Sequence, residues 1–216
     1  MKFKKYLMAS GILFLMFCLF TGVVLSVDVQ AIGPEGSSIG LATINKAFAE
    51  RVGVHLLWYE ITDFLGLVAI GVALGFAALG LIQLLVRKSI KKVDPQIIVL
   101  GAFYSLVVFT YAFFEFVIVN YRPIILEGEL EASYPSSHTI LILCVMSTAM
   151  MMFDYLLSNK KILRWILNAA AIVVMAVTVV GRLICGIHWL TDIIAGILLS
   201  AALVMLFCAA IRFFKK

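Results

Sequence analysis

Six long apolar runs dominate this sequence, at about 6–27, 64–86, 97–119, 138–157, 164–183 and 189–211. A helix of roughly 20 apolar residues crosses the hydrocarbon core of a bilayer. An open sheet cannot do so, because its edge N–H and C=O groups would have no partners in lipid. The runs therefore predict an all-α integral membrane protein, a bundle of six transmembrane helices forming one domain over residues 1–216.

The composition supports a chain of the membrane class. Of the 216 residues, 64% are hydrophobic and 13% are charged, whereas soluble domains average about 45–50% apolar and about 25% charged residues. Disordered chains combine low hydrophobicity with many charges. The composition therefore excludes both an ordinary soluble domain and a disordered chain.

The first run follows a basic start, which is also typical of a secretory signal peptide. The run is long for the apolar region of such a peptide, and no clear pattern of small residues for cleavage follows it. We therefore expect the run to be retained as the first span.

The longest connection covers residues 28–62. It begins with residues typical of turns, including Gly33, Pro34 and Gly36. From about residue 39 to residue 55 the apolar residues recur with a helical period. We expect a short interfacial helix there, in the first outer loop.

The basic residues orient the spans. If six helices alternate in direction, 13 of the 17 Lys and Arg residues fall on one side: Lys2, Lys4, Lys5, Arg87, Lys88, Lys91, Lys92, Lys160, Lys161, Arg164, Arg212, Lys215 and Lys216. Basic residues are enriched in cytoplasmic loops. This side, with both termini, is therefore predicted to be cytoplasmic. The net charge of +5 then reflects membrane orientation, and we expect no nucleic-acid partner.

The four cysteines, Cys18, Cys144, Cys185 and Cys208, all lie in apolar stretches. A disulfide framework or a zinc cluster would place cysteines at short spacings or in loops. Neither is expected here.

Five polar residues lie near the predicted outer ends of the spans: Arg122, His138, Arg182, His188 and Asp192. Arginine is costly near hydrocarbon, so at such a depth it usually serves an anion or a functional cavity. The five residues come from three separate regions of the chain. The sequence predicts that they converge at one membrane face.

Their local spacing indicates phosphate chemistry. His188 and Asp192 are four residues apart, so on a helix they would share a face, and the carboxylate would accept a hydrogen bond from one ring nitrogen and leave the other free to react. Ser136 and Ser137 precede an apolar run and are typical of a helix start, where free N–H groups bind phosphate. Arg122 can offer a bidentate fork to phosphate oxygens.

These residues resemble a known three-part signature. Arg122-Pro123, then Pro135-Ser136-Ser137-His138, then Arg182-x5-His188-x3-Asp192 is similar to the pattern of the type 2 phosphatidic acid phosphatase (PAP2) superfamily, usually written K-x6-RP, PSGH and SR-x5-H-x3-D. Order, spacing and predicted outer location all agree. The motifs cover about residues 115–192, and the six-span plan extends the resemblance to most of the chain.

Three positions depart from the family pattern. Glu115 stands where the family has lysine, Ser137 replaces the glycine of PSGH, and Gly181 replaces the serine before the arginine. Glu115 reverses the charge at a phosphate-binding position. It could point elsewhere, pair with an arginine, or face a substrate that carries a cation. A guess is that Lys46 or Arg51 supplies the missing charge.

The resemblance implies a metal-independent lipid phosphatase with no cofactor. By motif position, His188 would be the nucleophile that forms a phosphohistidine, Asp192 would orient it, and His138 would be the general acid. The phosphate oxygens would be held by four residues: Arg122, Arg182, Ser136 and Ser137. The substrate would be a polyprenyl pyrophosphate, phosphatidic acid or phosphatidylglycerol phosphate, hydrolysed at the extracytoplasmic face of the cell membrane.

Other functions remain open on the sequence. The alternative is a non-catalytic lipid-phosphate binder or transporter on the same scaffold, motivated by Glu115. Channels and secondary transporters find little support, since no inverted repeat or broken span is visible. Glu127, Glu129 and Glu131 alternate in an outer loop. Such oxygen ligands can bind a divalent cation, although a solvated loop is the more common outcome.

Overall fold

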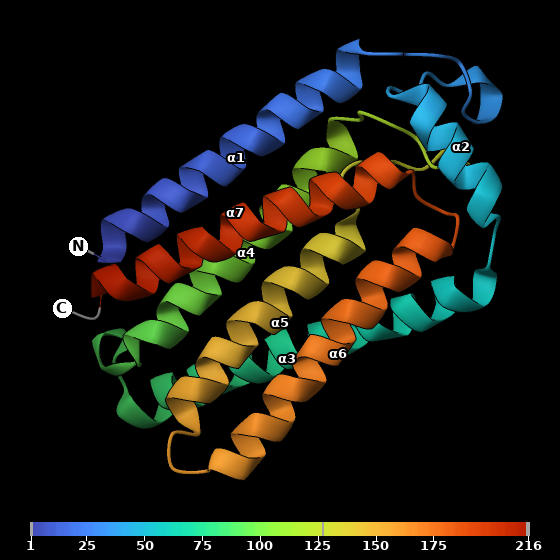
Figure 1. The fold of residues 1–216 in the computed structure, drawn as a ribbon. Coiled ribbons are helices and arrows are strands. Elements are labelled where there is room, and N and C mark those ends of the chain that lie inside the picture. Colours follow the sequence, from blue (N-terminus) through green and yellow to red (C-terminus); the bar gives the residue numbers. More distant parts are fainter. Residues whose placement is uncertain (1, 127, 215–216) are drawn as a thin grey trace.

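The computed structural model describes residues 2–126 and 128–214, and its regular secondary structure within these ranges is helical, apart from two isolated bridges. The helices are α1 (Lys2–Ser26), α2 (Ala42–Val52), α3 (Leu56–Arg87), α4 (Pro95–Phe116), α5 (Ser137–Leu156), α6 (Lys161–Ile184) and α7 (Leu190–Phe214), with short 3-10 turns η1 (Pro34–Gly36) and η2 (Ile90–Lys92). Figure 1 shows them as a bundle with one short helix, α2, across one end.

Six of the helices in the described ranges are long and apolar enough to cross a membrane: α1, α3, α4, α5, α6 and α7. The predicted six-helix membrane fold is therefore confirmed. Helix α2 lies within the segment for which a short outer helix was expected.

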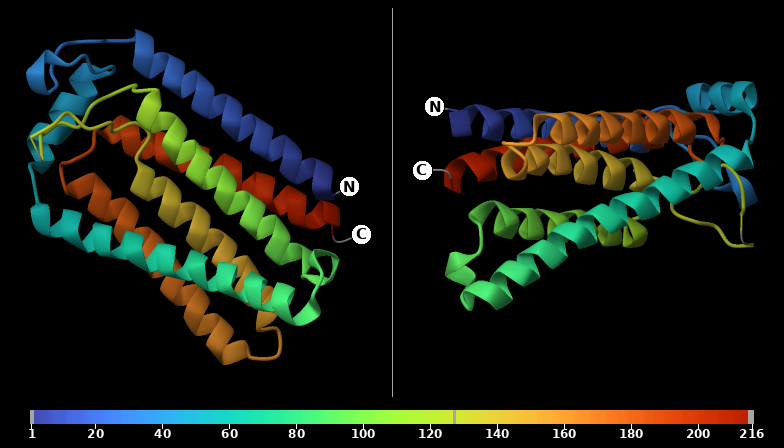
Figure 2. Two further views of the ribbon diagram at one scale, coloured as in Figure 1. Left: turned by 180° about the vertical axis from the view of Figure 1, so that it is seen from behind. Right: turned by 90° about the horizontal axis from the view of Figure 1, so that it is seen from below.

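Helix α3 differs most from its predicted range: it begins at Leu56, whereas the sequence predicted a start at about residue 64. Glu60 and Asp63 break the apolar pattern of this first part. At about 1.5 Å per residue, a helix of 32 residues is longer than the roughly 30 Å hydrocarbon core. Figure 2 shows α3 running obliquely to its neighbours. The first two turns of α3, which contain Glu60 and Asp63, therefore extend beyond the apolar length that a span needs.

Helix α7 is the centre of the bundle and contacts α1, α2, α4, α5 and α6. Small residues permit this close packing. A Cβ atom on Gly196 would lie 3.0 Å from Cβ of Thr139 and 3.2 Å from the carbonyl oxygen of Ser136. The start of α5 therefore rests against the start of α7, which brings the second and third sequence motifs together.

The two ends of the bundle differ in content. The termini, the α3–α4 connection and the α5–α6 connection lie at one end (Figure 1). The opposite end holds residues 27–55, the α4–α5 connection and the short α6–α7 turn. All the residues of the three motifs lie at this second end.

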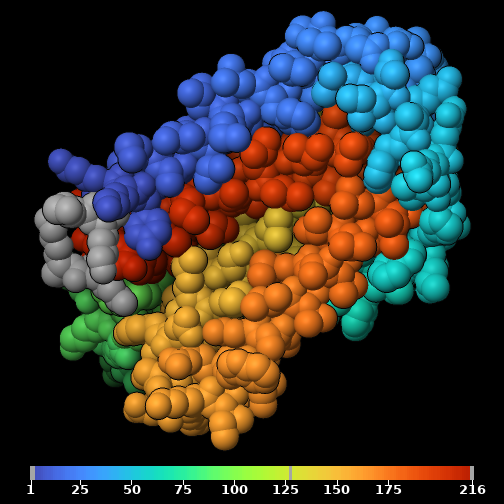
Figure 3. Space-filling model, in the orientation of Figure 1, coloured from blue at the N-terminus to red at the C-terminus, as the bar shows by residue number. Residues whose placement is uncertain are grey.

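Helix α2 is docked on the start of α7. Asn45 is fully buried, and its side-chain amide donates to Oγ1 of Thr191 at 3.0 Å and to the carbonyl of Gly40 at 2.9 Å. Its side-chain oxygen accepts the backbone N–H of Thr191 at 3.2 Å. A first-turn N–H has no acceptor within its own helix, so Asn45 supplies one from another element. Figure 3 shows α2, in light blue, lying against the orange-red start of α7.

Candidate active site

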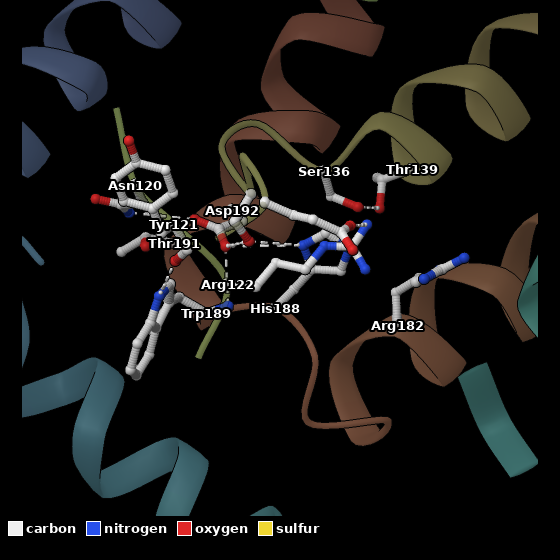
Figure 4. A network of polar contacts seen from close by, with 12 residues as sticks. Asn120, Tyr121, Arg122, Ser136, Thr139, Arg182, His188, Trp189, Thr191 and Asp192 are labelled. Carbon is white, nitrogen blue, oxygen red and sulfur yellow. Dashed lines mark hydrogen bonds and ion pairs between the residues drawn. The ribbon is translucent and has the colours of Figure 1, made fainter. Parts of the chain in front are cut away.

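Four segments form the candidate site: the early part of α3, the α4–α5 connection, the start of α5, and the turn between α6 and α7. Figure 4 shows the labelled side chains of Arg122, Ser136, His188 and Asp192 close together between these segments, with Arg182 beside them. The five polar residues predicted to meet come from elements far apart in the chain, and the bundle brings them to one end.

The start of α5 keeps several backbone donors open. Ser136 is the residue before the helix, and its hydroxyl caps no backbone N–H but accepts from Oγ1 of Thr139 at 3.1 Å. The N–H of Ser136 donates to the carbonyl of Asp192 at 3.0 Å. That donor is therefore not available to phosphate. The N–H groups of Ser137, His138 and Thr139 lie in the first turn, where a helix offers no internal acceptor.

His188 and Asp192 do not share a helix face, contrary to the expectation from their spacing. His188 lies in the turn before α7, and Asp192 lies in the first turn of that helix. Nδ1 of His188 is 3.8 Å from Oδ2 of Asp192, which is too long for a hydrogen bond. The hydroxyl of Ser133 lies between them, 2.9 Å from Nδ1 and 2.5 Å from Oδ2.

Asp192 is fully buried and well supplied with donors. Besides the Ser133 hydroxyl, its oxygens accept the backbone N–H of Trp189 at 2.9 Å and the side-chain amide of Asn120 at 3.3 Å. A buried carboxylate is stable only where it is paired or hydrogen-bonded. These three donors hold the carboxylate in place behind His188.

Arg182 is fully buried and is held by Asp63, a residue of α3 that the motifs do not include. Nη2 of Arg182 donates to Oδ1 of Asp63 at 2.5 Å, and the guanidinium carbon lies 5.0 Å from the centre of the Tyr59 ring. Nε2 of His138 lies 3.0 Å from the same carboxylate oxygen. Asp63 therefore links the second and third motifs through α3.

Arg122 is held in a similar way by Glu131. Nη2 of Arg122 lies 3.0 Å from Oε2 of Glu131, and the backbone N–H of Arg122 donates to the carbonyl of Glu131 at 3.0 Å. Glu131 thus serves as the counter-charge of an arginine, which differs from the solvated loop expected for it. Glu127, its neighbour in the predicted acidic group, lies outside the described residues.

Six buried nitrogen atoms of the site have no hydrogen-bond partner within residues 2–126 and 128–214: Nε and Nη1 of Arg122, Nε and Nη1 of Arg182, Nδ1 of His138 and Nε2 of His188. In each arginine the remaining nitrogen, Nη2, faces a carboxylate. Buried donors without partners are costly. Two anchored guanidinium groups and two imidazoles therefore keep buried nitrogens free of protein partners at this end of the bundle.

The pKa of His188 reflects these neighbours. Burial lowers the pKa of the imidazole below its ordinary value, the Asp192 carboxylate opposes that shift, and the charges of Arg182 and Arg122 add to it. The lower pKa favours a neutral ring with a free lone pair, the form that a nucleophile requires.

The departure at Gly181 has a packing reason. A Cβ atom there would lie 2.5 Å from Cγ2 of Thr62 and 3.2 Å from Cε3 of Trp58, both on α3. A real Cβ atom essentially never lies so close to another atom, so a larger residue would force these side chains or α3 to shift. Glycine at this position permits the close approach that brings Asp63 to Arg182.

Glu115, the other main departure, lines a cavity of about 320 Å³ between α3, α4 and α5. Most of the lining is apolar, and Ser137 and His138 form part of its polar end. Glu115 is exposed and forms no ion pair in the described part of the chain. Lys46, one of the two residues suggested to supply a compensating charge, lies 4.0 Å from Glu50 along the exposed face of α2.

Within the described ranges, no group of three or more His, Cys, Asp or Glu side chains is placed to hold a metal ion. The charges that face the site are instead those of the two arginines.

Sequence reasoning missed two residues of the site. Ser133 lies only two residues before the second motif, but it sits in a turn-like segment where serine carries little signal. Asp63 lies far from every motif, although a charged residue at the edge of an apolar run is a signal that could have drawn attention to it.

Comparisons with known proteins identify the family and agree with the fold. The family model of the PAP2 superfamily matches residues 68–216. A solved structure described as the first transmembrane PAP2 type phosphatidylglycerolphosphate phosphatase, from Bacillus subtilis, is similar with a TM-score of 0.60 and 19% sequence identity, over 96% of each chain. At that identity the likeness shows the fold alone. No curated protein sequence matches the chain significantly. Because the family model covers more than half of the chain and includes all three motifs, the chain belongs to the PAP2 superfamily and is a phosphatase with helices that can span a membrane.

Proposed function

We propose that this protein hydrolyses the terminal phosphate of a membrane lipid through a phosphohistidine on His188, without a metal ion. The observation that carries the proposal is the set of unpartnered nitrogens on Arg122, Arg182, His138 and His188. Phosphoryl transfer depends mainly on positioning and on neutralising the charge of the equatorial oxygens. Two anchored guanidinium groups and the open N–H groups at the start of α5 have the chemistry for both tasks.

The proposed reaction has two steps. The lone pair on Nε2 of His188 attacks phosphorus, the bond from phosphorus to the leaving oxygen breaks, and that oxygen takes a proton from His138. Water then attacks the phosphorus and gives a proton to His138, while the electron pair of the P–N bond returns to Nε2. Asp192 orients His188, and Arg122, Arg182, Ser136 and Ser137 hold the non-bridging oxygens.

A lipid substrate fits the cavity between α3, α4 and α5. Its apolar lining suits a hydrocarbon chain, and its polar end lies beside His138. A lipid phosphate can therefore reach the site from the bilayer while its head group stays at the polar end. The proposed substrates are a polyprenyl pyrophosphate, phosphatidic acid or phosphatidylglycerol phosphate.

The site is proposed to face the extracytoplasmic side. Its residues lie at the end of the bundle opposite the termini. The basic residues of the sequence gather at the terminal end, which the positive-inside rule assigns to the cytoplasm.

The first test is phosphate release from these lipids by the purified protein in detergent. Wild-type protein is expected to release phosphate equally with and without EDTA. His188→Ala is expected to lose at least about 10³-fold of the turnover, because a nucleophile mutant keeps only residual catalysis from the rest of the site. Turnover of His188→Ala at the wild-type rate would refute the nucleophile, and release blocked by EDTA would indicate a metal enzyme. No release from any lipid would favour a lipid-phosphate binder.

The pH dependence of the activity is a second test of the same proposal. The pKa of His188 lies below its ordinary value of about 6.5 because burial disfavours the cation. The nucleophile should therefore stay neutral as the pH falls below that value, and on the acid side activity should be lost only as the pH falls through the lowered pKa. Loss of activity as the pH rises would instead report removal of the proton that His138 donates. Besides burial, three charged groups contribute to the pKa of His188: Asp192 raises it, and Arg182 and Arg122 lower it. An acid limb whose midpoint lies above pH 6.5 would contradict the assignment of His188.

A further inference from the structure

Ser133 occupies the gap between the proposed nucleophile and its carboxylate. Its side chain is buried, and its hydroxyl lies 2.9 Å from Nδ1 of His188 and 2.5 Å from Oδ2 of Asp192, whose direct separation is 3.8 Å. We infer that Ser133 is a positioning residue, which joins His188 to Asp192 in a three-membered relay and thereby fixes the tautomer of the histidine. The inference rests on the proposed role of His188 as nucleophile.

The direction of the two hydrogen bonds follows from counting protons. A carboxylate can only accept, so the single hydroxyl proton of Ser133 is donated to Asp192. The hydroxyl oxygen is then an acceptor toward His188, and Nδ1 must carry the ring proton. Nε2 is left as the bare nitrogen, and it is the atom of His188 without a partner among the described residues. The relay thus presents the lone pair that the reaction needs.

The backbone around Ser133 holds the hydroxyl in place. Its N–H donates to the carbonyl of Asn120 at 2.9 Å, beside the bridge between Tyr121 and Ala132. The next residue, Tyr134, is buried, and its hydroxyl lies 2.7 Å from Oγ1 of Thr21 on α1. The serine is therefore fixed on both sides, and no shift of a flexible loop is needed to form the relay.

The relay stabilises the histidine ring during transfer of the phosphoryl group. As Nε2 forms its bond to phosphorus, the ring becomes cationic and its Nδ1–H proton becomes more acidic. The oxygen of the Ser133 hydroxyl accepts this Nδ1–H proton, and the hydroxyl proton is donated to the Asp192 carboxylate. The positive charge of the ring is thereby stabilised without the transfer of any proton. Without the hydroxyl, the 3.8 Å gap leaves the Nδ1 proton unbonded, and the tautomer that protonates Nε2 is no longer disfavoured.

The direct test is nitrogen NMR of the full-length protein in detergent, labelled with ¹⁵N-histidine. The sequence has three histidines, and His188→Gln assigns the signal of His188. The relay requires a ring protonated on Nδ1 and bare on Nε2 at neutral pH. A ring protonated on Nε2 would overturn it. This measurement uses the unmodified protein, so it decides the inference even where a substitution at Ser133 prevents folding.

The kinetic test separates a relay from a merely structural serine. Ser133→Ala is expected to lower kcat by about 10- to 100-fold, as a lost orienting hydrogen bond does, with KM within about twofold. Ser133→Thr keeps the hydroxyl and should recover most of the rate. Because Asp192 acts through the hydroxyl, Asp192→Asn should cost much less in the Ser133→Ala background than in the wild type.

Ser200→Ala is the matched control. This serine is also buried, but its hydroxyl bonds to the carbonyl of Gly196 within α7, so kcat should not change. Additive losses for Ser133→Ala and Asp192→Asn, or a wild-type kcat for Ser133→Ala, would overturn the relay alone. An active His188→Ala would instead overturn the proposed function, so the two failures are distinguishable.

Discussion

At the scale of single residues, the site is built from charges in pairs. Each arginine has one nitrogen against a carboxylate, Glu131 for Arg122 and Asp63 for Arg182, and two nitrogens directed elsewhere. A buried guanidinium is costly without a counter-charge. The carboxylates therefore allow the arginines to stay buried and fixed in orientation before any phosphate arrives.

A substitution at Asp63 tests whether these carboxylates hold the arginines in position. Asp63→Asn removes the counter-charge of Arg182 while keeping the size of the side chain. We expect kcat to fall by about tenfold or more, because a misplaced donor is lost where charge develops in the transition state. Glu60→Gln is the matched control, since Glu60 lies one turn earlier on α3 and is exposed. Lipid phosphate turnover, with kcat and KM measured separately, provides the comparison.

The opposite result has a clear meaning. If Asp63 only repels phosphate, Asp63→Asn would raise kcat/KM instead of lowering it. That outcome would contradict the positioning role of Asp63.

At the scale of elements, the short helix α2 holds the third motif in place. Asn45 accepts the N–H of Thr191 and donates to its hydroxyl, and Thr191 is next to Asp192. The connection from residue 28 to residue 55 is thus a structural support for the first turn of α7. An interfacial helix was expected from the sequence, but its docking on α7 was not.

Removing this support should weaken both stability and turnover. Asn45→Ala leaves the buried N–H of Thr191 and the carbonyl of Gly40 without partners, at a cost of about 1–3 kcal/mol. For a chain of this size the melting temperature should fall by roughly 2–10 °C, and kcat should fall with it. Lys46→Ala is the control, because Lys46 is exposed and pairs only with Glu50. Thermal unfolding in detergent gives the comparison, and equal melting temperatures for the two variants would rule out the support role.

The elements also show how far the sequence alone could reach. The six spans were predictable because hydropathy is a local property of about 20 residues. The early part of α3 was not, because Glu60 and Asp63 interrupt its apolar pattern. The motif residues were predictable from their spacing, whereas the insertion of Ser133 between His188 and Asp192 and the pairing of Asp63 with Arg182 depend on contacts across the chain.

At the scale of the whole molecule, the basic connections and the motif residues lie at opposite ends of the bundle. The basic connection between α3 and α4 lies at the same end as the termini, and the motifs lie at the other. In the proposed topology, positive charge at the terminal end keeps that end in the cytoplasm. The two arginines of the motifs, at the other end, are paired with carboxylates.

Thiol labelling in intact cells tests the orientation. Ser38→Cys lies in the connection before α2 and Lys91→Cys lies between α3 and α4, and both native residues are exposed. A maleimide that cannot cross membranes is expected to label Ser38→Cys directly and Lys91→Cys only after the cells are permeabilised. The unsubstituted protein gives the background from its own cysteines. The reverse pattern would place the site in the cytoplasm.

The contact between Gly181 and α3 has an evolutionary consequence. A larger residue at 181 would force the side chains of Thr62 and Trp58, or α3 itself, to shift, and would disturb the neighbouring contact of Asp63 with Arg182. We therefore expect the glycine and the acid to occur together in related sequences. Among homologues, those that keep serine before this arginine should lack the acid on the second long helix and must neutralise the buried guanidinium by some other means.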